Sequence, residues 1–372
     1  MAYTEREKAW IWLSGFEGMD AHRFDCVLSV FPDPRDVMES GTRENLSFLQ
    51  NPKLIEKILS RRSRDYLDDY LDMLDEKGIR CLIRESGGFP PMLRGIPMEP
   101  AVLYVKGRDD VPLEKCIAMV GSRRCSRYGL EMTGRIAKGL AAQGVVTVSG
   151  LARGIDSAAH RASLEAGGMT IGVLGCGVDV VYPAENERLF RDVMERGMII
   201  SEYPPGTTPH KMNFPPRNRI ISGLSSGVVL IEAQEKSGTM ITVRHATEQG
   251  REVFAVPANI TSPQSYWPNR LIREGAALVL DAQDILSELR WDTVDKKASE
   301  KGRETLEDLI LGDEEALIVA ALMKGEMIVD ELCMVTGLSA QNLNVHLTTL
   351  EMQEIIEQFP GMRVALHNKY GV

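Results

Sequence analysis

The residues best suited to chemistry in this chain follow short apolar runs and combine glycine, hydroxyl and arginine side chains. The clearest group is Gly121-Ser122-Arg123-Arg124, directly after the apolar run at 116–120. Glycine lets the backbone approach a phosphate, a hydroxyl donates a hydrogen bond to it, and the guanidinium fork matches its oxygens. This group therefore predicts a phosphate contact.

Similar groups follow the later apolar runs. Those predicted to contact the phosphates are Gly121, Ser122, Arg123, Arg124, Arg153, Lys211, Phe214, Arg217, Asn218, Arg219, Ser237, Gly238 and Thr239. Those predicted to shape the loops are Ser149, Gly150, Gly154, Asp156, Gly175, Gly177, Glu202 and Glu232. Asp156 is expected to cap a following helix, and His160 to be structural. Arg153 has an alternative role, an ion pair with Asp156 or Glu202 that holds the loops.

Phe214 is an aromatic residue among the cations Lys211, Arg217 and Arg219. An aromatic ring beside cations suits a nucleobase stacked next to its phosphate. The alternative is that the ring packs its loop onto the sheet. A single nucleotide does not need so many cations from separate loops, so the pattern favours a strand of several phosphates.

Short apolar runs alternate with helical patterns through the middle of the chain. Strands are expected at 79–83, 101–105, 116–120, 145–148, 170–174, 198–201, 227–231, 252–256 and 277–280, and helices at 127–143, 157–166, 185–195, 217–222, 239–249 and 282–289. This alternation is typical of an α/β, Rossmann-like doubly wound, mostly parallel sheet. Ligands of such sheets bind beyond the carboxyl ends of the strands, where the groups above lie.

The chain is long enough for several domains. Residues 1–76 read as a small all-α domain whose corner at 17–20 resembles a helix-hairpin-helix with one glycine. Residues 77–290 are expected to form the extended Rossmann-like domain, 291–304 a polar linker and 305–372 a winged-helix-like domain. In the last of these, Ser339 is the expected N-cap of the recognition helix, and 359–361 the wing turn.

Composition excludes several classes. There is no apolar run long enough to span a membrane and no signal peptide, so we expect a cytoplasmic protein without a membrane partner. The six cysteines form no CxxC pair, so we expect reduced core residues and no metal. No GxGxxG follows the strand at 116–120, no GxxxxGK[ST] occurs, and no GxSxG elbow follows a strand, so we expect neither a cofactor nor a catalytic centre.

The net charge of −10 is unevenly distributed. From 108 to 290 there are 21 Lys/Arg and 20 Asp/Glu, whereas 305–372 has 3 and 11. A local basic face in the middle of the chain is therefore compatible with the overall acidity. The predicted recognition helix, about 340–353, contains no Lys or Arg and should repel phosphate, which favours a protein-binding or regulatory role for the C-terminal domain.

Several strings resemble the DNA-processing protein A family (DprA, also called Smf). They are Gly121-Ser122-Arg123, SGLARGID at 149–156, FPPRNRIISGLS at 214–225, SGT at 237–239 and FAVP at 254–257. The resemblance implies a dimeric, non-enzymatic single-stranded DNA binder that loads RecA recombinase onto incoming DNA in natural transformation, displacing or bypassing single-strand-binding protein. It implies a DNA pocket that includes 121–124, Lys211, Arg217 and Arg219, and dimerisation through the later part of the Rossmann-like domain. The chain departs from the pattern at Ala258-Asn259, where a glycine is usual.

Two other functions are considered. Nucleotide phosphoribohydrolases carry PGGxGTxxE, and the corresponding stretch here keeps Gly238-Thr239 but has Thr242 where the catalytic glutamate would stand. Cleavage of a glycosidic bond needs a carboxylate, so its loss argues against this alternative. A transcription regulator acting through the winged helix is disfavoured by the missing cations of the recognition helix.

Overall fold

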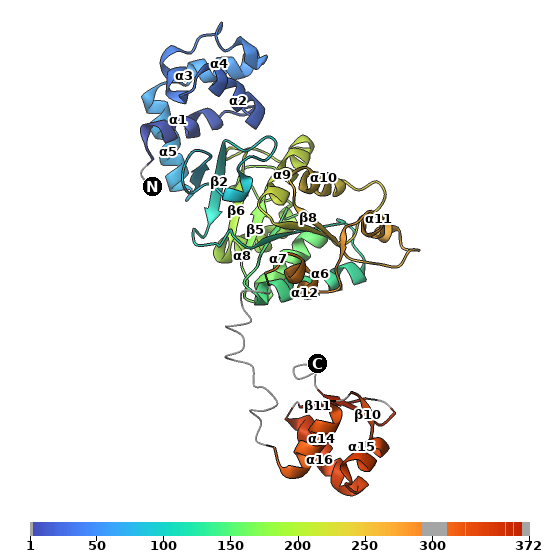
Figure 1. Ribbon diagram of the computed structural model, residues 1–372. Helices are drawn as coiled ribbons and strands as arrows, with labels where there is room; N and C mark the ends of the chain where they lie inside the picture. Colours follow the sequence, from blue (N-terminus) through green and yellow to red (C-terminus); the bar gives the residue numbers. More distant parts are fainter. Residues whose placement is uncertain (1–2, 292–310, 324, 354, 360, 367–372) are drawn as a thin grey trace. The chain divides into compact units, whose positions relative to one another are not determined.

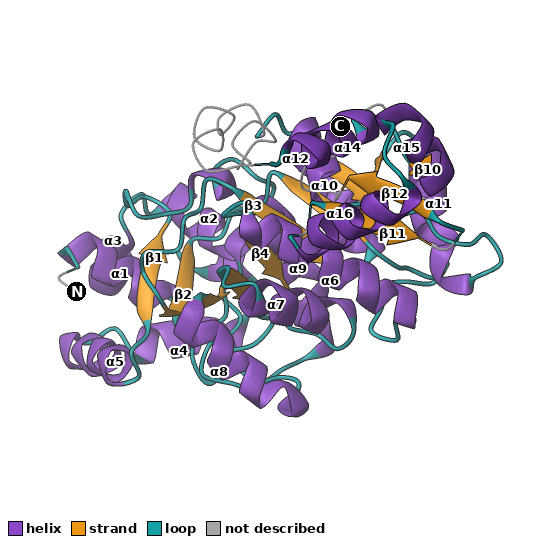
Figure 2. Ribbon diagram, turned by 90° about the horizontal axis from the view of Figure 1, so that it is seen from below, coloured by secondary structure: helices purple, strands orange, loops and turns teal. Residues whose placement is uncertain are grey.

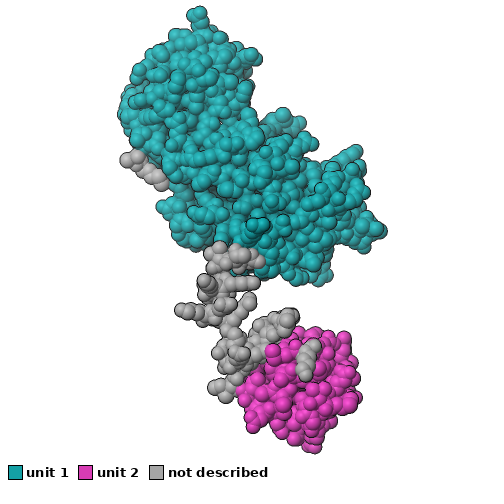
Figure 3. Space-filling model, viewed as in Figure 1, with its two compact units in different colours: residues 1–292 teal, residues 293–372 magenta. Residues whose placement is uncertain are grey.

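The computed structural model describes residues 3–291, 311–323, 325–353, 355–359 and 361–366. The described residues fall into two compact units, 1–292 and 293–372 (Figure 3). The predicted linker, apart from Trp291, and Pro360 of the predicted wing turn lie outside the described residues.

The first unit begins with short helices, which the apolar spacing predicts. Among its described residues these are α1 (Glu5–Ser14), α2 (Ala21–Val30), α3 (Pro34–Ser40), α4 (Pro52–Ser60) and α5 (Arg64–Glu76). Each begins at a residue whose side-chain oxygen accepts a backbone N–H of the first turn: Thr4, Asp20, Asp33, Asn51 and Ser63. Such caps satisfy N–H groups that have no partner within the helix.

The rest of the unit is built on one sheet, which has nine strands in the described part of the chain, in the order β1-β2-β6-β5-β4-β3-β7-β8-β9. The strands are β1 (Arg80–Ile83), β2 (Val102–Gly107), β3 (Cys116–Val120), β4 (Val146–Ser149), β5 (Thr170–Val173), β6 (Met198–Ser201), β7 (Gly227–Leu230), β8 (Glu252–Ala255) and β9 (Ala277–Leu278). From β6 to β9 the neighbours are parallel, whereas β2 is antiparallel to β6 and to β1. The predicted mostly parallel sheet is confirmed.

Helices cover both faces of the sheet (Figures 1 and 2). They are α6 (Arg127–Ala142), α7 (Ile155–Glu165), α8 (Glu187–Arg196), α9 (Phe214–Gly223), α10 (Met240–Glu248), α11 (Tyr266–Arg273) and α12 (Ala282–Glu288). In β3, Ala118 belongs to a core shared with α9 and α10, and its neighbour Ile117 to a core shared with α6, α7 and α12. Because successive strand residues point to opposite faces, the all-apolar strand fits a sheet that is buried on both sides.

A third core joins the N-terminal helices to the sheet. It contains Trp10 and Trp12 of α1 together with Tyr104 of β2 and Ile199 of β6. The buried Tyr104 hydroxyl lies 2.9 Å from the Ser14 hydroxyl. The helices and the sheet therefore share buried contacts within the unit, and the predicted domain boundary at residue 76 stays a prediction.

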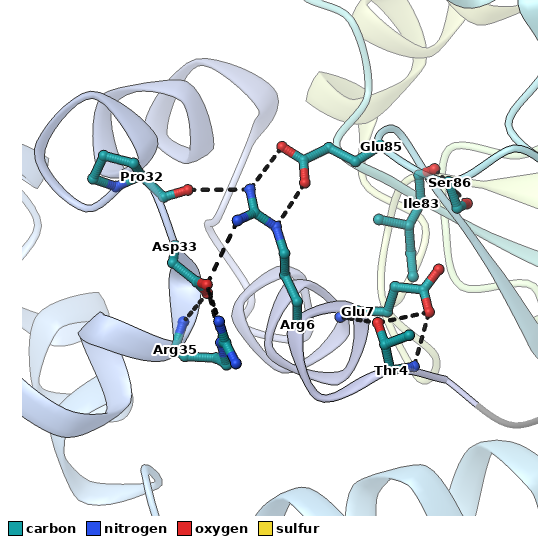
Figure 4. Close-up of polar contacts among 9 residues, drawn as sticks. All are labelled: Thr4, Arg6, Glu7, Pro32, Asp33, Arg35, Ile83, Glu85 and Ser86. Carbon is teal, nitrogen blue, oxygen red and sulfur yellow. Dashed lines mark hydrogen bonds and ion pairs between the residues drawn. The ribbon is translucent and has the colours of Figure 1, made fainter.

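At the surface, Arg6 of α1 bridges the same two parts (Figure 4). Its Nε and Nη2 donate to the two carboxylate oxygens of Glu85, at 2.8 and 3.0 Å. Nη2 also donates to the Pro32 carbonyl at 3.3 Å, and Asp33 lies 3.5 Å from Nη1. The side chains of the Arg6–Glu85 pair are 42% and 45% exposed, so this pair contributes little to stability.

The second unit consists of α14 (Asp313–Leu322), β10 (Met327–Ile328), α15 (Val329–Thr336), α16 (Ala340–Met352), β11 (Ile356–Phe359) and β12 (Arg363–Leu366). Within its described residues the strands form one sheet in the order β10-β12-β11. The Ser339 side chain accepts the Asn342 N–H at 3.3 Å, which confirms the predicted N-cap of the recognition helix.

Candidate nucleic-acid interface

The site lies where the order of the parallel strands reverses. The chain runs from β3 through β4, β5 and β6 on one side, and returns to β7, β8 and β9 on the other side of β3. The loops after β3 and β7 therefore leave in opposite directions and open a crevice beyond the strand ends. A cavity of about 670 Å³ lies there.

Most of the predicted residues line this cavity. They are Gly121, Ser122, Arg123, Arg124, Asp156, Lys211, Phe214, Arg217, Asn218, Ser237, Gly238 and Thr239. These residues come from the loops after four strands, β3, β4, β6 and β7, as the rule for ligand sites of parallel sheets predicts. The cavity is also lined by three polar residues that the sequence patterns did not predict, Tyr182, Gln234 and Lys236. Lys236 directly precedes Ser237-Gly238-Thr239, and that adjacency could have identified it.

A smaller cavity of about 40 Å³ adjoins the first. Its wall shares Arg123, Tyr182, Phe214 and Arg217 with the larger cavity. Gly150, Arg153 and Gly175 line only this smaller one. Of the predicted loop glycines, Gly150 and Gly175 thus contribute to the site through this second cavity.

Phe214 stands at the junction of the two cavities. Its ring centroid lies 5.9 Å from the Arg123 guanidinium, 5.8 Å from that of Arg217 and 5.4 Å from the Tyr182 ring centroid. A Cβ at Gly175 would come within 3.0 Å of Phe214 Cδ1, so this glycine makes room for the ring. The ring is half-buried, so it packs its loop and still presents an aromatic surface between two cations.

Arg217 is buried beneath the ring. Its Nη1 donates to the Gly150 carbonyl at 3.0 Å and to the Val173 carbonyl. Burial lowers the pKa of this guanidinium to about 10, against the opposing charge of Asp156. The side chain therefore carries its charge at neutral pH and holds the ends of β4 and β5 together.

The sequence predicts that Asp156 caps the following helix, and the structure shows that it does not. The N-cap of α7 is Gly154, and Asp156 lies within the first turn. Its carboxylate accepts the backbone N–H groups of Gly150 and Ala152, at 3.2 and 3.4 Å. Burial raises the pKa of this carboxyl, while Arg217 acts in the opposite direction. Asp156 therefore closes the loop that precedes its helix.

Arg219 does not line the cavity, contrary to its predicted place in the site. It is 4% exposed, and Nη1 and Nη2 each donate to one oxygen of Glu202 at 2.7 Å. Its Nε donates to the Met98 carbonyl at 2.7 Å. The guanidinium is fully engaged inside the protein, so Arg219 positions α9 and Glu202 is its counter-ion.

Arg153 has a different partner from those considered. It forms an ion pair with Glu185, and neither Asp156 nor Glu202 contacts it by an ion pair among the described residues. The side chains of both Arg153 and Glu185 are at least half exposed. A pair this exposed is weak and leaves Arg153 able to exchange partners.

The remaining predicted residues tie the loops to one another. Thr239 Oγ1 donates to the Gly121 carbonyl at 3.2 Å, and the Ser122 N–H donates to the Glu232 carbonyl at 2.8 Å. The Glu232 carboxylate accepts the Ser126 N–H at 2.8 Å, at the N-terminus of α6. A carboxylate there is stabilised by the helix dipole, so this contact fixes the loop at 121–124 to α6.

A buried hydrogen bond of Ser149 and close backbone packing at Gly154 and Gly177 also shape the loops. Ser149 Oγ donates to the Met119 carbonyl at 2.7 Å. Gly154 has φ +76°, and a Cβ there would lie 2.3 Å from the Ser122 carbonyl oxygen. A Cβ at Gly177 would lie 2.8 Å from the Gly206 nitrogen. The two glycines allow backbone segments to meet where any side chain would clash.

Among the described residues, no three His, Cys, Asp or Glu side chains are grouped so that they could hold a metal ion. In the same part of the chain, no helix has both the length and the apolar character needed to cross a membrane. His160 is buried away from the cavity, with Nδ1 2.6 Å from Thr170 Oγ1.

Comparison with protein families decides the assignment. The family model described as DNA recombination-mediator protein A matches residues 80–290, and that of the DprA winged helix domain matches residues 304–362. This chain belongs to the DNA recombination-mediator protein A family.

Individual members of the DNA recombination-mediator protein A family are similar to this chain in sequence and structure. DNA processing protein DprA of Bacillus subtilis is 40% identical over 255 residues, 68% of this chain and 84% of the relative. Protein Smf of Synechocystis is 33% identical over 342 residues, 84% of this chain and 86% of the relative. The crystal structure of DprA from Streptococcus pneumoniae matches with a TM-score of 0.64 and 35% identity, over 77% of this chain and 99% of that one.

A structure of Helicobacter pylori DNA processing protein A, described for its single-stranded DNA binding mode, also matches. Its TM-score is 0.51 at 29% identity, over 57% of this chain and 96% of that one. The predicted family and the C-terminal winged helix domain are thereby confirmed.

Proposed function

We propose that this protein binds single-stranded DNA in the cavity beyond β3 and β7 and acts as a recombination mediator. The observation that carries the proposal is the convergence of Arg123, Arg124, Lys211 and Lys236 on one cavity around the half-buried ring of Phe214. Cations on separate loops suit consecutive phosphates, and an aromatic ring among them suits a base. The single-stranded DNA binding described for the Helicobacter pylori relative supports the proposal.

The finer role extends from family membership. The protein loads RecA recombinase onto incoming single-stranded DNA in natural transformation, displacing or bypassing single-strand-binding protein. It acts as a homodimer through the later part of the Rossmann-like domain. The exposed Leu278 of the edge strand β9 and the nearby Leu280 support that choice of surface, since they are 44% and 55% exposed.

A binding titration tests the DNA-binding proposal. Full-length protein is titrated into fluorescein-labelled oligothymidylate and into a duplex of equal length, at low and at moderate salt. The single strand should bind more tightly than the duplex, and its affinity should fall steeply with salt because counterions are released. Arg123→Glu should abolish most of the binding, with Lys138→Glu on α6 as the control. Equal affinity of folded Arg123→Glu and wild-type protein would contradict the site assignment.

Nucleotide hydrolysis is the alternative function. Thr242 lines the cavity at the position where a phosphoribohydrolase has its catalytic glutamate. The nearby Asp156 carboxylate already accepts two backbone N–H groups, which occupies it structurally. Incubation with AMP should therefore leave the nucleotide intact, and release of adenine and ribose phosphate would favour the enzyme.

A further inference from the structure

The C-terminal unit exposes an unusual share of apolar side chains. Among the described residues, nine exposed large apolar side chains lie within 311–366 and ten within the much longer stretch 3–291. Those of the C-terminal unit are Leu317, Met323, Ile328, Met334, Val335, Val345, Met352, Phe359 and Met362. Exposed apolar patches on soluble domains mark sites of interaction when they are contiguous.

Strand register places two of these side chains in one row across the sheet, on either side of an arginine whose aliphatic stem lies between them. Ile328 of β10 and Phe359 of β11 both pair with Arg363 of β12. Residues opposite one another in neighbouring strands share a face of the sheet. Ile328 is 40% exposed and Phe359 39%. We call Ile328, Phe359 and Arg363 the wing-sheet face.

The opposite face of this sheet is covered by helices. Val364 and Ile356 are buried there against Leu343 and Leu347 of α16, in a core that also contains residues of α14 and α15. Since alternate strand residues point to opposite sides, the helices pack on the side away from Phe359 and Ile328. In the described part of the unit, the wing-sheet face is therefore the side of the sheet without a helix.

Charge indicates what could cover this face. The described residues of 311–366 include eight carboxylates: Asp313, Glu314, Glu315, Glu326, Asp330, Glu331, Glu351 and Glu357. Arg363 is the one Lys or Arg among the described residues of 311–366, and its Nη1 lies 2.9 Å from Glu326 Oε1. This excess of negative charge repels nucleic acid and a second copy of the unit alike. It attracts a basic polypeptide, and the exposed methionines adapt to varied apolar partners.

We propose that the wing-sheet face docks a lysine- and arginine-rich segment of a partner protein, whose apolar side chains pack on Ile328 and Phe359. The net negative charge of the unit steers the segment to the sheet. This activity is separate from the DNA cavity of the first unit and does not depend on it. It gives the acidic winged helix a protein-binding role in place of DNA reading.

The test uses full-length protein and a fluorescein-labelled amphipathic peptide of lysine and leucine as the probe, followed by fluorescence anisotropy. Wild-type protein should bind the peptide saturably, and added salt should weaken the binding. The double variant Ile328→Ser/Phe359→Ser should bind at least about tenfold more weakly, because two apolar contacts are lost. Val345→Ser, an exposed apolar change on α16, should stay within about twofold of wild type.

Further measurements separate the competing occupants. The double variant must keep its far-UV circular dichroism and its affinity for oligothymidylate, since both replaced side chains are outside the core. Three outcomes would overturn the proposal: unchanged peptide affinity in the double variant, equal binding of a glutamate–leucine peptide, or an effect of Val345→Ser as large as that of the double variant. Loss of duplex DNA binding or of self-association in the double variant, with peptide affinity unchanged, would also overturn it.

Discussion

Replacing Glu202 with Gln, or Arg219 with Met, should destabilise the first unit without weakening its contact with single-stranded DNA. The two side chains are 12% and 5% exposed and form a bidentate ion pair with both N···O distances at 2.7 Å. Removing one partner of a buried pair costs about 3 kcal/mol, because the other charge stays desolvated. At about 2 °C per kcal/mol for a unit of this size, Tm should fall by about 6 °C.

Thermal unfolding followed by circular dichroism measures the stability, and anisotropy with labelled oligothymidylate well below Tm measures the affinity. The double variant Glu202→Gln/Arg219→Met should lose less stability than the sum of the single losses, since the second change removes the unpaired charge. Arg123→Met is the matched opposite case, with Tm nearly unchanged and affinity strongly reduced. A folded Arg219→Met protein with wild-type Tm and a large loss of affinity would refute the role assigned to Arg219.

Three further predictions concern the same unit. Lys211→Gln and Lys236→Gln should each weaken single-strand binding and reduce the salt slope by about 0.7 per lost phosphate contact, and an unchanged slope would remove that lysine from the DNA path. Burial lowers the pKa of His160 to about 3, so below the usual pKa of 6.5 the unfolded state binds more protons than the folded state. The free energy of unfolding, measured with urea, should therefore fall from about pH 6.5 toward pH 3, by about 2 kcal/mol at pH 5. This fall should be smaller in His160→Gln. Gly154→Ala should reduce both DNA affinity and Tm, because the added Cβ clashes with the Ser122 carbonyl. Gly144 has a similar φ of +70°, but among the described residues no atom beyond its two chain neighbours lies within 4 Å of its added Cβ, so Gly144→Ala should cost only the backbone strain. Equal losses in the two variants would exclude the clash with Ser122 as the cause.

The doubly wound sheet could be predicted because its signals are local. The strand at 116–120 is apolar throughout, as burial on both faces requires, and its loop carries Gly121 and Arg123 at the strand end. The rule that ligands bind beyond the carboxyl ends of strands then gathers distant segments into one site. The antiparallel placement of β2 beside β6 followed from no such rule, since pairing of distant strands depends on the whole sheet.

The residue types at the strand ends specify the kind of site, whereas the packing of the helices selects which cations face it. Arg217 and Arg219 belong to the same helical string, and their residue types predict the same role. Residues two apart on a helix point in different directions, so only one of the two can line the cavity. Packing of α9 on the sheet turns Arg217 to the cavity wall and Arg219 to Glu202, which a string of residue types cannot specify.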